Sequence, residues 1–410
     1  MDLVRAGPRV RTRVEVSPES LFGPDNLPYG VFAPTGGSPR VGVRLGEHVI
    51  DVAALLDDPL FAQPSLNAFL AQGPARWRAV RDRIREAVEG EVDSAAVHPL
   101  SDVALRLPVR IGDYVDFYAS IDHATNLGRL FRPDGDPLLP NWRHLPVGYH
   151  GRAGTVVVSG TDVARPCGQR RSESGAPDFG PSRRLDIEAE LGFVIGVGSR
   201  LGAPVGIDEF ADRVFGVALV NDWSARDIQA WEYQPLGPFL GKSFATSMSP
   251  WITPLAALES ARVPLPEQSP APLPYLRGTE HWGLDIELTV AWNGQPVAYP
   301  PYRRMYWSPA QMLAHLTSNG AATRPGDLYA SGTVSGPEPD QRGSFIELSW
   351  GGSEPVLVND RKRTFLEDGD EVTITASAPG PGPARIGLGE VTGRIVPAHS
   401  PGRGAQERRR

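Results

Sequence analysis

The chain has 410 residues, enough for a large core and two domains, and its 22% charged and 40% hydrophobic residues are ordinary values for a soluble globular protein. The formal net charge is −7 and the last residues, RGAQERRR, form the one basic cluster, so we expect no nucleic-acid partner and a solvated tail at 401–410. A single cysteine excludes an intrachain disulfide and a cysteine-built metal cage, while the lack of a signal-like segment or an apolar run of ~20 residues predicts an unexported, cytoplasmic protein without a membrane partner.

The first part of the chain predicts a small domain with a hairpin and helices. Residues 1–16 form an expected loose leader. Residues 41–52, VGVRLGEHVIDV, alternate around a Gly-Glu turn, which predicts a β-hairpin. Residues 65–89 predict one or two amphipathic helices, because apolar residues recur there at helical spacing: Trp77, Val80, Ile84 and Val88. Two prolines and an extended pattern follow, and we place a domain boundary near residues 100–115.

The remaining sequence is rich in predicted strands. The candidates are residues 155–160, 185–198, 213–222, 284–294, 343–350 and 371–378. Helices are predicted at 224–233 and 308–318, each opened by a serine that could cap it, and Ser224 with Asp227 fits a capping box. Glycine (45) and proline (41) are spread along the chain, as expected of many short strands joined by ordered loops. The prediction is a mainly β or α+β fold.

The tripeptide Gly-Lys-Ser at 241–243 raises the question of a phosphate-binding loop. Such a loop needs the pattern G-x-x-x-x-G-K-[ST] between a strand and a helix. The upstream glycine, Gly237, is one residue too close, and Pro238 follows it. We therefore expect Lys242 to serve another purpose.

Three acidic residues alternate with apolar ones in LDIEAELGF. On a strand, Asp186, Glu188 and Glu190 would share one face. The common interpretation of this pattern is the solvated face of an antiparallel strand. The alternative is a hard-cation site, because clustered carboxylate oxygens suit Mg²⁺ or Ca²⁺.

A nearly continuous apolar run at 214–220 predicts a buried strand, followed by Asp222. An acid at this position either has a function or caps the next helix. On that predicted helix, Arg226, Gln229 and Tyr233 are spaced i, i+3, i+7 and share a face. The face is either an ordinary surface stripe or, beside a cation, a cradle for a negatively charged oxygen.

The segment at 112–132, GDYVDFYASIDHATNLGRLFR, offers a general base. His123 lies near Asp116, Tyr118 and Arg132 in sequence, and a histidine suits proton transfer near neutral pH. Five other histidines are expected to be structural or surface groups, namely His48, His98, His281, His315 and His399.

Two further segments leave function and scaffolding open. The rigid Pro/Gly setting of LPNWRHLPVGYHGR holds His144, Tyr149 and His150. Thr333 lies in a Gly/Ser loop, and Glu347 falls on the predicted alternating strand at 343–350, where it could face solvent. From its residues alone, the chain is interpreted as a β-rich enzyme that acts with a cation on an anionic or carbonyl substrate; the bond stays unidentified.

Several of these stretches resemble the fumarylacetoacetase family: LPYGVF (27–32), DFYASIDHATN (116–126), LLPNWRHLPVGYHGR (138–152), NDWSARDIQAWEYQPLGPFLGKSFAT (221–246), SGTVSGPE (331–338) and ELSW (347–350). The resemblance runs from about residue 17 to about residue 397. It implies a small N-terminal SH3-like barrel domain at 17–110, a catalytic domain with a mixed β-sandwich roll at 111–400, and a homodimer.

The resemblance also implies roles for individual residues. The cation ligands would be Asp116, Glu188, Glu190 and Asp222, with Lys242 and Thr246 beside them. His123 would be the general base, oriented by Glu347, and the developing oxyanion would face Arg226, Gln229 and Lys242. The substrate would be bound by Tyr118, Arg132, Tyr149, Tyr233 and Thr333.

The implied reaction is hydrolysis of the carbon–carbon bond of fumarylacetoacetate, a dicarboxylic β-diketone, with Mg²⁺ or Ca²⁺, as the last step of tyrosine and phenylalanine degradation. Water activated by His123 would attack a carbonyl, and the cation would stabilise the leaving enolate. Two rivals stay open. One is a related hydrolase or decarboxylase acting on fumarylpyruvate or another oxo acid, and the other is a catalytically silent dimeric binding protein.

Overall fold

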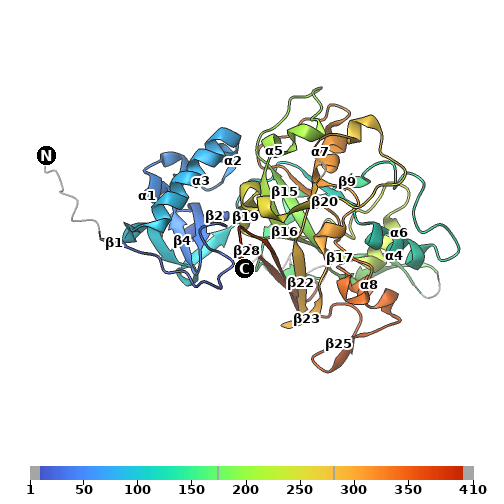
Figure 1. Ribbon diagram of the computed structural model, residues 1–410. Coiled ribbons are helices and arrows are strands. Elements are labelled where there is room, and N and C mark those ends of the chain that lie inside the picture. The colour runs from blue at the N-terminus through green and yellow to red at the C-terminus, as the bar shows by residue number, and fades with distance from the viewer. Residues whose placement is uncertain (1–9, 173–174, 280–281, 400–410) are drawn as a thin grey trace, which may run out of the picture.

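The computed structural model describes residues 10–172, 175–279 and 282–399. Figure 1 shows a smaller lobe, which holds α1, α2 and α3, beside a larger lobe that holds the remaining helices. In the part of the chain that the structure describes, the helices are α1 (Val52–Leu56), α2 (Asn67–Leu70), α3 (Pro74–Glu89), α4 (Ile121–Phe131), α5 (Phe210–Arg213), α6 (Arg226–Glu232), α7 (Pro309–Thr317) and α8 (Phe345–Leu348). None of these helices has the length and apolar character required to cross a membrane.

The largest sheet runs through both lobes. Its main path, in spatial order, is β6 (Val97–Pro99), β4 (His48–Asp51), β3 (Arg40–Leu45), β2 (Tyr29–Pro34), β19 (Trp251–Pro254), β16 (Val214–Asp222), β15 (Ala189–Ile195), β24 (Leu328–Ala330), β8 (Tyr114–Phe117) and β9 (Gly148–His150). Off this path lie β7 (Val103–Arg106), β10 (Val156–Val158) and β18 (Thr246–Met248). The pairing of β2 with β19 joins the two lobes, so the strand order is open, from β6 to β9, over the described residues.

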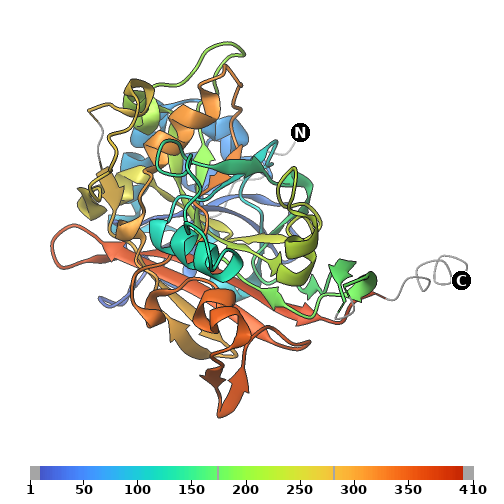
Figure 2. The same ribbon diagram turned by 90° about the vertical axis from the view of Figure 1, so that its right-hand side faces the viewer.

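A second sheet packs in the larger lobe. It consists of β11 (Val163–Ala164), β28 (Arg385–Val396), β27 (Glu371–Pro379), β22 (Glu287–Trp292) and β23 (Gln295–Ala298). Figure 2 shows the long orange-red strands β27 and β28 running across this lobe. Short pairs complete the strands: β1 (Arg11–Thr12) with β5 (Val92–Asp93), β12 (Cys167–Arg171) with β13 (Pro177–Pro181), β14 (Leu185–Asp186) with β17 (Ser224–Ala225), β20 (Arg262–Pro264) with β21 (Trp282–Leu284), and β25 (Val356–Val358) with β26 (Arg361–Arg363).

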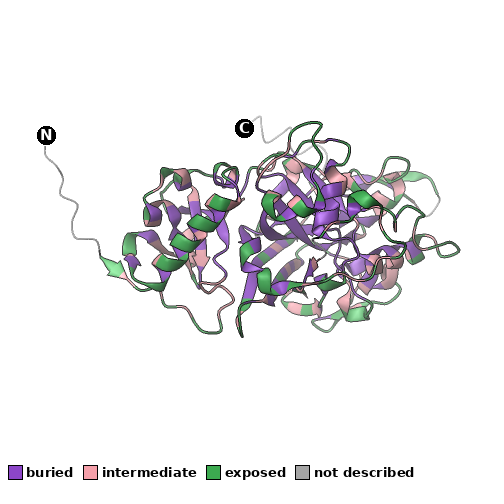
Figure 3. Ribbon diagram, turned by 45° about the horizontal axis from the view of Figure 1, so that its top comes forward, coloured by how far each residue is buried: buried purple, intermediate pink, exposed green. Residues whose placement is uncertain are grey.

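The apolar run at 214–220 is explained by a sheet that is buried on both faces. Side chains alternate along a strand, so successive residues face opposite sides. Val217 and Leu219 join the core of the larger lobe, whereas Ala218 and Val220 join a second core shared with the smaller lobe. Figure 3 shows the central strands as almost entirely buried. The predicted buried strand is therefore confirmed as β16.

Other predicted elements are confirmed with small changes of bounds. The hairpin at 41–52 is β3 paired antiparallel with β4, and the helical pattern at 65–89 resolves into α2 and α3. The predicted helix at 308–318 is α7, and Ser308 caps it by accepting a hydrogen bond from the Gln311 N–H at 3.1 Å. The overall composition is mostly β with helices, as predicted.

Two predicted features are wrong. Residues 345–348 form helix α8 rather than part of a strand, and the N–H groups of Phe345 and Ile346 donate to the carboxylate of Asp186 rather than to a neighbouring strand. Ser224 does not cap α6: it lies in β17, and its hydroxyl donates to the carbonyl of Asp222 at 3.0 Å. Asp227, its supposed capping partner, instead accepts from the Ser182 hydroxyl at 2.6 Å.

Parts of the predicted ends lie outside the described residues. These are residues 1–9 of the expected leader and the basic tail at 401–410. Within the rest of the leader, Arg11–Thr12 pair with Val92–Asp93 at the edge of the smaller lobe.

Candidate active site

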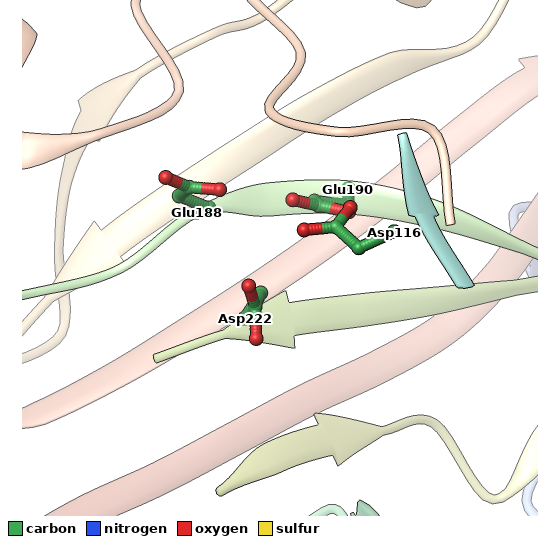
Figure 4. Close-up of side chains that lie close together, drawn as sticks. All are labelled: Asp116, Glu188, Glu190 and Asp222. Carbon is green, nitrogen blue, oxygen red and sulfur yellow. The ribbon is translucent and has the colours of Figure 1, made fainter. Parts of the chain in front are cut away.

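Four buried carboxylates converge in the larger lobe. Asp116, Glu188, Glu190 and Asp222 each offer an oxygen atom, and these atoms all lie within 4.8 Å of one another. Figure 4 shows Glu190 on one strand with Glu188 just before it, Asp222 at the end of the neighbouring strand, and Asp116 approaching from a third. The solvated-face interpretation of 186–190 is therefore wrong, since all three acids of that segment are buried.

The strand register explains why these acids meet. Strands β15 and β16 are antiparallel, with Ala189 opposite Asn221, so the start of β15 adjoins the end of β16. The Asp222 N–H donates to the Glu188 carbonyl at 3.1 Å, which ties the two carboxylate-bearing residues together. On the other side of β15, strand β24 pairs with β8, and this places Asp116 beside the same edge.

Two buried cations balance part of this negative charge. The Lys242 ammonium lies 2.8 Å from Glu188 Oε2 and 2.7 Å from Asp222 Oδ2. Arg226 Nη1 donates to Glu188 Oε1 at 2.6 Å. Glu188 thus forms ion pairs with both cations. Burial raises the pKa of its carboxyl, but the attraction of Lys242 and Arg226 is stronger, so the pKa is lowered.

Asp222 shares the Lys242 ammonium with Glu188, whereas Asp116 and Glu190 form no ion pair with either cation. Burial raises the pKa values of Asp116 and Glu190 well above their ordinary range, and the neighbouring carboxylates raise them further. Asp116 Oδ1 and Glu190 Oε1 are buried without a hydrogen-bond partner among the described residues. Buried polar atoms ordinarily have partners, so unpaired carboxylate oxygens that face one another fit the oxygen-rich ligand set of a hard divalent cation.

A second buried pair lies close to this cluster. His123 comes from α4 and Glu347 from α8, and the distance from His123 Nδ1 to Glu347 Oε2 is 2.7 Å. His123 lies in the first turn of its helix, where its backbone N–H donates to the capping hydroxyl of Ser120 at 3.2 Å. Burial raises the pKa of the Glu347 carboxyl, but His123 and several hydrogen bonds outweigh it, so the pKa is lowered and the carboxylate stays charged.

A cavity of about 410 Å³ is lined by His123 of this pair and by Asp116 and Glu188 of the carboxylate cluster, whereas Glu190, Asp222 and Glu347 are not among its lining residues. Its lining includes many of the sequence-predicted residues, namely Asp116, Tyr118, His123, Arg132, Tyr149, Glu188, Arg226, Gln229, Tyr233 and Lys242. The shared face predicted for Arg226, Gln229 and Tyr233 is thus directed at this cavity. Its remaining wall is largely apolar, with side chains that include Phe131, Leu139 and Leu236.

Other predicted residues lie around the cavity without lining it. Thr246 donates to Asp222 Oδ1 at 2.9 Å, behind the carboxylates. Thr333 is buried, and its hydroxyl has no partner among the described residues. His144 and His150 are exposed. Of the histidines expected to be structural or surface groups, His281 lies outside the described residues, and the cavity lining contains none of the other four: His48, His98, His315 and His399.

Several polar partners of this site were not predicted from the sequence. Asp186 does not belong to the carboxylate cluster; it pairs with Arg226 Nε at 2.8 Å. Glu347 accepts from Asn126 Nδ2 at 3.0 Å and from the Ser335 and Ser344 hydroxyls at 3.0 and 2.7 Å. The i, i+3 spacing of His123 and Asn126 would have indicated their shared face had α4 been predicted as a helix. The sequence carries no comparable signal for the two serines.

Comparisons with known proteins agree with this geometry. The family model described as Fumarylacetoacetate (FAA) hydrolase C-terminal matches residues 114–396, and the model described as Fumarylacetoacetase N-terminal matches residues 25–108. The fumarylacetoacetase of Homo sapiens is 45% identical over 416 residues, covering 95% of this chain and 99% of the human protein. That of Arabidopsis thaliana is 44% identical over 417 residues, with 95% and 99% covered.

Solved structures share the fold at lower identity. Fumarylacetoacetate hydrolase from psychrophilic Exiguobacterium antarcticum superposes with a TM-score of 0.57 at 19% identity, over 91% of this chain and all (100%) of that one. Maleylpyruvate hydrolase from Sphingobium sp. SYK-6 gives a TM-score of 0.52 at 20% identity, again over 91% and 100%. Together with the two family models and the near full-length relatives, these findings show that the chain belongs to the fumarylacetoacetate hydrolase family.

Proposed function

We propose that this protein hydrolyses the carbon–carbon bond of fumarylacetoacetate to give fumarate and acetoacetate, with the help of a divalent cation, Mg²⁺ or Ca²⁺. The observation that carries the proposal is that one cavity is lined both by His123, which is paired with Glu347, and by Asp116 and Glu188 of the carboxylate cluster. A base on one side and a hard-cation site on the other suit the addition of water to a polarised carbonyl. The relatives named fumarylacetoacetase support this choice of substrate.

The cation would be held by Asp116, Glu188, Glu190 and Asp222, whose oxygens converge and are only partly paired. When bound, it supplies Lewis-acid polarisation of the diketone oxygens. Lys242 and Thr246 hold Asp222 at 2.7 and 2.9 Å, and so fix the carboxylate that the strand end presents. An all-oxygen ligand set accepts several hard cations, and both Mg²⁺ and Ca²⁺ are within the proposal.

His123 acts as the general base in this mechanism. Its Nδ1–H donates to Glu347, which leaves Nε2 to accept a proton from water. The water oxygen then forms a bond to the carbonyl carbon on the fumaryl side, and the carbonyl becomes an alkoxide. Glu347 stabilises the imidazolium, since three further donors keep its carboxylate in place and charged.

Arg226, Gln229 and Lys242 stabilise the alkoxide. Arg226 Nη2 is a buried donor that lacks a partner among the described residues, and Gln229 Oε1 accepts from Arg226 Nη1 at 3.2 Å, which leaves the Gln229 amide nitrogen to donate. Collapse of the alkoxide breaks the bond between the attacked carbonyl carbon and the adjacent methylene carbon. The electron pair leaves as an enolate, which takes up a proton to become acetoacetate, while the other fragment is fumarate.

The remaining lining suits a dicarboxylate with an unsaturated chain. Arg132, Tyr118 and Tyr233 offer donors for carboxylate and carbonyl oxygens. The proposed set also includes Tyr149, whose hydroxyl donates to Asp222 Oδ2 at 3.3 Å, and the buried Thr333, whose hydroxyl has no partner among the described residues. Phe131, Leu139 and Leu236 offer apolar surface for the carbon chain.

Finer features belong to the same proposal. We propose an SH3-like domain at 17–110 and a β-sandwich roll at 111–400, and the two family models, which match residues 25–108 and 114–396, support this division. A homodimer, a cytoplasmic location and a place at the end of tyrosine and phenylalanine degradation follow from the family resemblance.

The test is the loss of the ultraviolet absorbance of fumarylacetoacetate on addition of the purified protein. The assay runs with a chelator, then with added Mg²⁺ or Ca²⁺, and the products are identified as fumarate and acetoacetate. The expected result is fast loss that the chelator stops and the cation restores. Consumption of fumarylpyruvate or another oxo acid in place of fumarylacetoacetate would refute the proposed substrate.

A further inference from the structure

Asp186 is a fully buried carboxylate that touches neither the cation site nor the cavity. It ends the short strand β14 and lies opposite Ser224 of β17, two residues before α6 begins. Four donors surround its two oxygen atoms. Oδ1 accepts the N–H groups of Ile187 and Phe345, both at 2.7 Å, while Oδ2 accepts the Ile346 N–H at 3.0 Å and Arg226 Nε at 2.8 Å.

These four hydrogen bonds distinguish Asp186 from the acidic residues near it in the sequence. An ionised carboxylate offers about four lone-pair sites, and here each has a donor. Asp116 and Glu190, in contrast, each keep a buried oxygen without a partner among the described residues. Asp186 therefore has nothing left to offer a cation, and its role must lie in what it holds.

One set of bonds fixes the helix that carries Glu347. Helix α8 is a single turn, Phe345–Leu348, and a helix this short depends on its contacts for stability. The residue at its N-cap position, Ser344, directs its hydroxyl to Glu347 rather than to the N–H groups of the first turn. Asp186, 159 and 160 positions away in sequence from Phe345 and Ile346, accepts those N–H groups instead. It thus serves as the cap of α8 and sets where Glu347 meets His123.

The remaining bond fixes the guanidinium of Arg226. With Nε held by Asp186 and Nη1 held by Glu188 at 2.6 Å, the plane of the guanidinium is defined at two of its three nitrogens. The third, Nη2, is the buried donor without a partner among the described residues. Asp186 therefore aims the group that would face the oxyanion.

We propose that Asp186 is a positioning residue that holds the general-base pair and the oxyanion arginine in one fixed geometry, so that both act on the same carbonyl. The inference rests on the proposed function for the roles of His123 and Arg226. A displacement of about 1 Å of such groups typically lowers turnover by about 10²-fold. Binding of the substrate's carboxylates, which uses other residues, depends much less on Asp186.

The first test is Asp186→Asn, with Asp370→Asn as the matched control. Asp370 is also a buried carboxylate that accepts from an arginine, Arg363, and from a backbone N–H, that of Glu367 at 2.7 Å, but it lies outside the cavity lining. Asp186→Asn replaces one acceptor oxygen by an NH₂ group, which would face the donors that now bind the carboxylate. We expect kcat per folded molecule to fall by about 10²-fold or more while KM and the thermal stabilisation by Mg²⁺ change little. The control should keep its kcat. Equal kcat in the two variants, or a loss confined to KM, would overturn the proposal.

A second measurement needs neither substrate nor a variant of Asp186. The Nδ1 proton of His123, hydrogen-bonded to Glu347, gives a downfield proton NMR signal that is assigned by its loss in His123→Gln. Arg226→Met removes the partner of Asp186, whereas Lys242→Met removes a buried cation that also binds Glu188 but does not touch Asp186. The proposal predicts a larger displacement or broadening of the signal in Arg226→Met.

Equal effects of the two substitutions on the NMR signal would show that Asp186 does not link Arg226 to the His123–Glu347 pair, and would refute the inference. The NMR result also separates the two proposals. An inactive wild-type protein in which Arg226→Met still perturbs the signal selectively would refute the proposed function while the coupling through Asp186 stands.

Discussion

His123 and Glu347 are 224 positions apart in the sequence, yet His123 Nδ1 lies 2.7 Å from Glu347 Oε2 in the interior of the larger lobe. The bond joins α4 to α8, two helices that the sequence analysis did not predict. The acceptor oxygen, Glu347 Oε2, also accepts hydrogen bonds from the hydroxyls of Ser335 and Ser344. The pair is thus rigid, and its direction leaves His123 Nε2 as the free nitrogen of the imidazole.

Replacing His123 by alanine is expected to abolish turnover with little effect on folding or on cation binding. The imidazole is the proposed base, whereas the carboxylate of Glu347 would still have three donors, from Asn126, Ser335 and Ser344. The measurement is the absorbance assay, together with melting temperatures with and without Mg²⁺. His399→Ala, at an exposed histidine, is the control. Retention of most activity in His123→Ala would overturn the assignment of the base.

Replacing Glu347 by glutamine is expected to lower kcat by about 10²- to 10⁴-fold, because the imidazolium loses its charged partner and the tautomer of His123 is no longer fixed. Asn126→Ala removes one of the donors to Glu347 and should have a smaller effect in the same direction. Both variants are compared by kcat and KM on fumarylacetoacetate. A Glu347→Gln variant that changes KM alone would contradict the proposed role.

Asp222→Ala is expected to abolish the rise in melting temperature that Mg²⁺ or Ca²⁺ gives to the wild type. A ligand that binds only the folded state must stabilise it, and Asp222 is one of the four converging carboxylates. Asp370→Ala serves as a control, since it removes a buried carboxylate elsewhere. An unchanged cation-induced shift in Asp222→Ala would argue against Asp222 as a ligand.

Much of this site was predictable, and the reason lies in local sequence. The acids at 188, 190 and 222 sit at the ends of strands whose apolar patterns are plain, so their nearness follows from pairing β15 with β16. The spacing of Arg226 and Gln229 on α6 and of Tyr233 at its C-cap likewise needs only the helical repeat. The resemblance to a family supplied the pairing of His123 with Glu347, which no local pattern indicates.

The errors in prediction have a common physical cause. The buried side of α4 consists of His123, Ala124, Leu127 and Gly128, so a polar and a small residue replace the apolar repeat that marks a helix. Helix α8 is one turn long and is capped by Asp186 from a distant strand. Asp186, Glu188 and Glu190 share an alternating pattern, but the strand breaks between β14 and β15, and Asp186 turns to a separate set of partners. Tertiary contacts decide each of these cases.

Lys242→Met is expected to destabilise the cation-free protein by about 3–5 kcal/mol, because Glu188 and Asp222 lose the buried ammonium that binds both. Lys362→Met is the matched control, since Lys362 is exposed and should change stability little. Urea unfolding in chelator gives the free energies. Equal free energies of unfolding of the two variants would show that the Lys242 ammonium does not stabilise the folded protein.

The stability of the cation-free protein should fall as the pH rises above the ordinary carboxyl range. Burial, and then the neighbouring carboxylates, raise the pKa values of Asp116 and Glu190 in the folded state. At these two carboxyls the folded protein therefore binds more protons than the unfolded chain, so their contribution to the free energy of unfolding is greatest below the unfolded pKa and is lost as the pH passes through the raised values. A bound cation replaces those protons, and its affinity should accordingly increase with pH.

The measurement is the melting temperature in chelator and in Mg²⁺ across pH 5–8, and the difference between the two should widen with pH. In Asp116→Asn, where one of the raised carboxyls is neutral at every pH, the decline in chelator should be shallower. A difference that stays constant with pH in the wild type would contradict the coupling of proton and cation at these carboxylates.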